Sequence, residues 1–210
     1  RRRMPPETQM LYYSVLPEKI LIWHLADENL TVAESPFDDG SLNSLLRNYH
    51  SALRKKDAAR DETRAAAERL YEILIKPVET ALDPKRPVCI VADKALFRLP
   101  FASLVAPATG RFLIEDFALF YAPSATVFIT ESEIAARKRL PSEAETILSV
   151  GNPAFSRSAY RELADLPSAE TEAAKIAGFY HAPEILPKER AVKDEVVKHL
   201  KKADVFHFAG

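Results

Sequence analysis

Residues 87–92 read PVCIVA, a short run that is apolar throughout. This pattern is typical of a strand buried on both faces, as in a parallel sheet covered by helices on both sides. Residues 146–155, TILSVGNPAF, show it again and end in a Gly-Asn-Pro turn. Residues 204–210, DVFHFAG, predict a third strand. These segments decide the fold class, and the rest of the chain is interpreted around them.

Helical patterns separate these strands. Residues 124–140, 168–180 and 191–203 have apolar residues at helical spacing. Between the first two strands, residues 112–124 predict one or two more strands. Strands that alternate with helices predict an α/β layered fold with a mostly parallel sheet. Ligands in such folds bind beyond the carboxyl ends of the strands, so the loops after Val91, Val150 and Gly210 are of interest.

The N-terminal part has a different pattern. Residues 19–25 (KILIWHL) and 30–34 (LTVAE) predict an antiparallel hairpin. Residues 41–56 and 61–83 have helical periodicity, and Pro77 should interrupt the second helix. We expect these elements to form a distinct layer against the α/β core that follows.

Composition excludes several classes of function. The chain has 210 residues and a net charge of −1, from 29 basic and 30 acidic residues, which is not the charge pattern of a nucleic-acid-binding protein. No apolar run approaches the roughly 18 residues of a membrane span. A single cysteine permits neither an internal disulfide nor a cysteine-rich zinc site. Residues 1–10 lack the apolar core that a signal peptide needs. We therefore expect these residues to be a linker remnant and the protein to be cytoplasmic.

Few residues qualify as candidates for chemistry. Cys89 lies inside the PVCIVA strand, away from any helix N-terminus or cation that would lower its pKa, so we expect a buried, structural cysteine. His207 lies near the end of a predicted strand, where a general base can sit, but phenylalanines flank it. The other histidines lack metal-ligand spacing and are interpreted as structural or solvated: His24, His50, His181 and His199. The five glycines and the GNPAF turn match no nucleotide fingerprint.

Six segments in order resemble one family. They are residues 11–25, 70–82, 89–104 (CIVADKALFRLPFASL), 112–128, 147–155 together with 166–180, and 203–210 (ADVFHFAG). The pattern L-x-x-LPF-x-x-L at residues 96–104, followed by APS and then HFAG, is specific in combination. The chain resembles the CHAT domain, a bacterial relative of caspases and separases that is often joined to tetratricopeptide repeats.

The resemblance implies a caspase-like three-layer α/β/α sandwich with a mostly parallel central sheet. Residues 11–85 would be its N-terminal hairpin and helical subregion, and residues 86–210 its core. Family members read H-F-A-x-H-G where this chain reads HFAG, so His207 matches the first histidine, which is not catalytic. The catalytic histidine and cysteine would follow Gly210. The chain itself would then hold no catalytic, cofactor-binding or metal-binding residue.

Three explanations of the chain end remain open: a designed truncation, an observed fragment, and one half of a domain that a second chain completes. If strand 204–210 is near the sheet centre, its open edge invites pairing with another chain.

The resemblance also implies a function. The complete domain would be a cysteine endopeptidase in bacterial signalling or defence, with a protein or peptide substrate and an upstream repeat module. The alternative is a non-catalytic pseudo-peptidase scaffold that docks protein partners. Caspase relatives often select a charged side chain, and Arg98 or Asp93 could take part, but we interpret both as solvated loop charges and assign neither to a site. An α/β hydrolase would need a G-x-S-x-G motif, which is absent.

Overall fold

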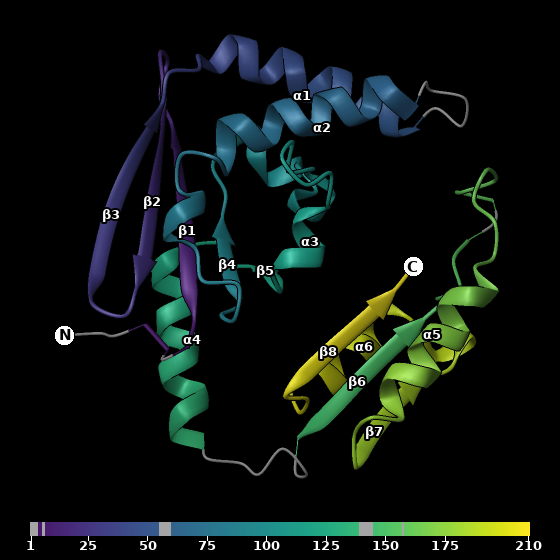
Figure 1. Ribbon diagram of the computed structural model, residues 1–210. Coiled ribbons are helices and arrows are strands. Elements are labelled where there is room, and N and C mark those ends of the chain that lie inside the picture. Colours follow the sequence, from purple (N-terminus) through teal and green to yellow (C-terminus); the bar gives the residue numbers. More distant parts are fainter. Residues whose placement is uncertain (1–3, 6, 55–59, 139–144, 157) are drawn as a thin grey trace. The chain divides into compact units, whose positions relative to one another are not determined.

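The computed structural model describes residues 4–5, 7–54, 60–138, 145–156 and 158–210 (Figure 1). The chain forms two compact units, Arg1–Arg137 and Lys138–Gly210. Each unit has its own sheet and its own covering helices, and each is described by itself.

The first unit contains the longer list of elements. Its strands are β1 (Gln9–Val15), β2 (Ile20–Ala26), β3 (Asn29–Ser35), β4 (Val88–Val91) and β5 (Leu119–Tyr121). Its α-helices are α1 (Asp39–Arg54), α2 (Arg60–Leu74), α3 (Leu113–Asp116) and α4 (Ala125–Lys138). Short 3-10 helices are η1 (Glu79–Ala81), η2 (Lys94–Arg98) and η3 (Phe101–Ser103).

The sheet of the first unit is mixed. Its strand order is β3-β2-β1-β4-β5, with antiparallel pairing among β1, β2 and β3 and parallel pairing of β4 with β1 and β5. The predicted hairpin is confirmed, because β2 pairs with β3 across a turn in which Asp27 has a φ of 53°. The prediction that this hairpin forms a separate layer is wrong. Strand β1 pairs with both β2 and β4, so the hairpin continues the same sheet (Figure 1).

Alternation along the strands places helices on both faces of this sheet. Leu11 of β1 and Ile90 of β4 are buried on the face that α1 and α2 cover. Their neighbours Met10 and Cys89 point to the opposite face, where Phe128 of α4 packs against them. Helix α2 ends at Leu74, before Pro77, as the proline predicts.

The second unit contains a small parallel sheet. Its elements are β6 (Thr146–Gly151), α5 (Pro167–Ala177), β7 (Ala182–Leu186), η5 (Lys188–Arg190), α6 (Lys193–Leu200) and β8 (Val205–Ala209). The strand order is β7-β6-β8, and both pairings are parallel. The described strands therefore form two sheets rather than the one predicted. Strand β8 pairs with β6 alone among the described strands, so it lies at an edge of its sheet and not at the centre.

Helices cover the two faces of this second sheet differently. On one face, the Ser149 hydroxyl donates a hydrogen bond to the carbonyl of Ala173 in α5, at 2.8 Å. On the other face, Leu148 and Val150 form a small cluster that Val196 of α6 packs against. The unit has its helices on both faces, but its buried cluster is much smaller than that of the first unit.

Two short elements differ from the sequence-based prediction. Residues 113–116 form α3 rather than strand, and the Glu115 carboxylate accepts the Phe112 N–H at 2.7 Å at its start. Strand β7 was not predicted from the sequence, and it contains Pro183. Proline is tolerated there because β7 pairs on one side only within the described sheet. No helix among the described residues has the length and apolar character to cross a membrane.

Candidate functional site

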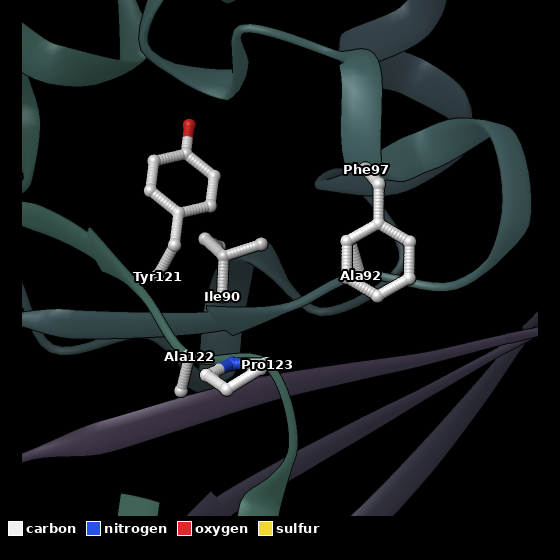
Figure 2. A pocket seen from close by; sticks show the side chains of 6 residues that line it. All are labelled: Ile90, Ala92, Phe97, Tyr121, Ala122 and Pro123. Atoms are coloured by element: carbon white, nitrogen blue, oxygen red, sulfur yellow. The ribbon is translucent and has the colours of Figure 1, made fainter. Parts of the chain in front are cut away.

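A pocket lies where two parallel strands of the first unit end. Strands β4 and β5 are hydrogen-bonded neighbours, so their carboxyl ends meet at one edge of the sheet. The pocket has a volume of about 300 Å³ and is lined by Ile90, Ala92, Phe97, Tyr121, Ala122 and Pro123 (Figure 2). This edge is where α/β folds bind their ligands, so it is the candidate site.

Each wall of the pocket comes from a different element. Ile90 of β4 is fully buried and forms the floor. Phe97 is supplied by η2, and Tyr121 is the last residue of β5. Figure 2 shows the two rings flanking Ile90. Phe97 is 61% exposed and Tyr121 is 53% exposed, so both rings have free surface for a ligand.

The loop after β4 is fastened at its start. The Asp93 carboxylate accepts the backbone N–H of Val15 at 2.8 Å, which ties this loop to the end of β1. Lys94 follows with a positive φ of 49° and forms an ion pair with Asp39 of α1 at 3.2 Å. The structure thus gives Asp93 a role in holding the loop. The sequence suggested only that Asp93 selects a charged substrate side chain or is a solvated charge in a loop.

Tyr121 is the only titratable residue among those that line this pocket. Burial raises the pKa of its hydroxyl, and the backbone N–H groups of Phe101 and Ala102 partly oppose that rise. The phenol is therefore neutral at neutral pH and cannot serve as a base there. The lining offers apolar surface and one hydroxyl, which suits an apolar side chain rather than a charged one.

Cys89 is next to the pocket in sequence but points away from it. Consecutive strand residues face opposite sides, and Cys89 lies on the α4 face with Met10. It is 0% exposed, and burial raises its thiol pKa to about 12. A nucleophilic cysteine needs a lowered pKa and access, and Cys89 has neither. The prediction that it is buried is confirmed.

Three of the other histidines, His24, His181 and His199, have local partners or face solvent. The ring of His24 is buried with its Nε2 at 3.3 Å from Gln9 Oε1, and burial and Arg86 lower its pKa. His199 lies between the carboxylates of Glu184 and Glu195. His181 is exposed. Across the described ranges, no group of three or more histidine, cysteine, aspartate or glutamate residues could hold a metal ion.

His207 lies on the α5 face of the second sheet. Its Nε2 is 3.3 Å from Oε1 of Glu172 in α5, and it is paired in register with Ser149. Phe206 and Phe208 point to the other face and are 43% and 53% exposed. The structure thus places the ring of His207 next to the carboxylate of Glu172.

The turn after β6 has a structural use that the sequence pattern does not reveal. Asn152 has a φ of 53°, and its side-chain carbonyl accepts the N–H of Leu166 at the start of α5, at 2.8 Å. The Gly-Asn-Pro motif signals a turn, but nothing in it indicates this contact with a residue far along the chain.

Comparisons with known proteins agree with the resemblance of the sequence to the CHAT domain. A sequence model of the CHAT domain matches residues 64–210. The human tetratricopeptide repeat protein 28 is 28% identical over 187 residues, which covers 83% of this chain and 7% of that protein. The mouse protein of the same name is 29% identical over the same shares.

This chain therefore spans about 7% of the length of these curated relatives. Both relatives are mammalian, so they give no support to the bacterial setting that the resemblance implies. The family match covers well over half of the chain and includes the loop after β4, the end of β5 and the whole second unit. On this basis the chain belongs to the CHAT domain family.

Proposed function

We propose that this chain is the N-terminal part of a CHAT-type cysteine endopeptidase, with its histidine and cysteine C-terminal to Gly210. The observation that carries the proposal is the pocket at the ends of β4 and β5 in a chain of this family. In the complete domain, a thiolate attacks the peptide carbonyl, the histidine protonates the leaving amine, and backbone amides stabilise the oxyanion. This chain would contribute the binding of a substrate side chain.

The proposed architecture of the complete domain is the caspase-like three-layer sandwich. Residues 11–85 would be the hairpin and helical subregion, and residues 86–210 the core, with residues 1–10 as a linker. The helices on both faces of each sheet support the layered part of this proposal. A role in signalling or defence, in the cytoplasm and next to a repeat module, is proposed with it.

The chemistry of the pocket sets the substrate preference that we propose. Rings of Phe97 and Tyr121 would hold an apolar side chain of the substrate over Ile90. The hypothesis of an acidic preference through Arg98 gains no support here, because Arg98 does not line this pocket.

The alternative function is a pseudo-peptidase scaffold that docks protein partners. One observation favours it: the relatives are named for tetratricopeptide repeats. In that case the same pocket would bind a partner side chain without cleavage.

The test uses the longest natural protein that contains these residues. We expect thiol-dependent hydrolysis of a peptide library, with unchanged turnover in Cys89→Ser because that thiol faces away from the pocket. Phe97→Ala should raise KM about tenfold for apolar side chains, the lower end of the range of roughly 10–200-fold for apolar pocket contacts, because the ring is partly exposed. Phe179→Ala, which removes an 81% exposed ring of the second unit, is the matched control.

Two outcomes separate the functions. Peptide binding that Phe97→Ala weakens, with no hydrolysis by the longer protein, supports the scaffold and overturns the peptidase. The 210-residue chain alone should be inactive, and cleavage by it that Cys89→Ser abolishes would contradict the assignment of that cysteine.

A further inference from the structure

A second pocket of the first unit is lined by cationic and polar side chains. It has a volume of about 620 Å³, and its lining residues are Arg47, His50, Ser51, Arg54 and Arg98. The first four are on α1 at spacings of three, four and seven residues, which places them on one face of the helix. Arg98 is at the end of η2. We call these five residues the basic pocket; it shares none of its lining residues with the apolar pocket at β4 and β5.

Helix α1 is held firmly behind the basic pocket. Its adjacent face buries Leu42, Leu46 and Tyr49 in the core. The hydroxyl of Tyr49 lies 2.8 Å from that of Ser103 in η3, with which it shares a hydrogen bond. The side chains on the pocket face are therefore presented by a packed helix rather than by a loop.

The arginines of the basic pocket differ from other arginines of this unit. Arg64, Arg86 and Arg111 each form an ion pair with a carboxylate at 2.8–2.9 Å. By contrast, no described carboxylate lies within 4.0 Å of the guanidinium of Arg47, Arg54 or Arg98. Arg47 donates to the hydroxyl of Ser44 at 2.9 Å, a neutral partner that leaves its positive charge in place. Three cations without a carboxylate partner among the described residues line one hollow, and together they attract an anion.

A ring nitrogen in the wall gives a second, independent observation. Nε2 of His50 is buried and has no hydrogen-bond partner among the described residues. Buried polar atoms without a partner are exceptional in proteins, and each needs an explanation such as a bound ion or water. A ligand bound against this wall of the basic pocket would be such a partner.

We propose that the basic pocket binds a small ligand carrying two or more phosphate groups. Guanidinium groups bind phosphate oxygens bidentately, and the serine hydroxyl adds a further donor. The three positive charges of the arginines exceed the single negative charge of a carboxylate. They match the several negative charges of a diphosphate. The C-terminal end of α1 carries a dipole charge of about −0.5, which is small against them. The volume lies within the range of roughly 300–1,000 Å³ for small-molecule sites. This inference does not depend on the proposed peptidase.

The test is calorimetric titration of the 210-residue chain with inorganic pyrophosphate. We expect saturable binding that weakens with added salt, because screening reduces the attraction between charges. Arg54→Ala and Arg98→Ala should each lower the affinity about tenfold, as expected for loss of one charge-assisted hydrogen bond. Arg137→Ala, an exposed arginine of α4, is the matched control and should bind as the parent does.

A folding check and titrations with two other anions complete the test. Each variant is first checked for an unchanged unfolding midpoint by fluorescence of Trp23, the one tryptophan of the chain. Citrate and sulfate test whether phosphate is required; citrate binding as tightly as pyrophosphate would overturn the phosphate assignment. Absence of binding at millimolar pyrophosphate, or binding that neither pocket variant weakens, would overturn the site itself.

Discussion

The two units of this chain achieve a layered fold with very different amounts of buried apolar surface. In the first, large side chains from the mixed sheet, α1 and η3 fill the core on the α1–α2 face, such as Tyr13, Tyr49, Ile90 and Phe101. The second buries a small cluster at the centre of its sheet: Leu148, Val150, Leu186 and Ala191. Full burial of one large apolar side chain stabilises a protein by about 1.5–3 kcal/mol. We infer that apolar burial dominates the first unit, whereas close backbone packing matters more in the second.

The close packing in the second unit is concentrated at one glycine. A Cβ atom added to Gly151 would lie 2.4 Å from the carbonyl oxygen of Ala169 and 2.7 Å from Cβ of Ala173. Helix α5 therefore approaches β6 as closely as it does because this residue has no side chain. Three predictions follow from the contrast, each with its own measurement.

The largest effect should come from Phe101→Ala in the first unit. Phe101 is fully buried, and its ring centroid is 5.3 Å from that of Tyr13. Its truncation leaves a cavity and should lower the free energy of unfolding by about 3–5 kcal/mol. Denaturant titration monitored by Trp23 fluorescence measures this change. Hydrogen exchange of the β6 amides should be unaffected, and an equal loss of protection there would show that the two units unfold together.

A smaller effect is expected from Gly151→Ala in the second unit. Overpacking of this kind costs roughly 1–3 kcal/mol, because α5 must move away from β6. Hydrogen exchange of the β6 amides is the measurement, and the Trp23 transition should keep its midpoint. Gly178→Ala is the matched control, since its added Cβ would be 3.3 Å from the nearest atom. Equal effects of the two substitutions would contradict the close-packing explanation.

The smallest predicted effect is a loss of stability of the first unit in alkali. Burial raises the pKa of Cys89 from 9.0 to about 12 in the folded chain. Its stabilising contribution is complete below pH 9 and is lost as the pH rises toward 12, because only the unfolded thiol ionises in that window. At pH 10 the loss should be about 1.4 kcal/mol. Unfolding of the parent and Cys89→Ala from pH 8 to 10, followed by Trp23, measures it; identical slopes would refute the assignment.

Local patterns predicted several of the strands. Strands β2, β3, β4, β6 and β8 were all expected. The burial of Cys89 was expected too, because this residue lies in a run that is apolar throughout. Strand β7 and helix α3 were not predicted. Each is short and has weak intrinsic preference, so contacts with β6 and with the Phe112 N–H decide their conformation.

The sequence by itself determined the family, the α/β class and the absence of an accessible thiol in this chain. Tertiary structure alone decided the strand partners and the two pockets. Adjacent residues show the difference: Phe97 lines the apolar pocket, and Arg98 lines the basic one. Periodicity reports which residues are buried, because burial follows local hydrophobicity. It carries no information about which distant segment covers them, because that depends on packing between elements far apart in the chain.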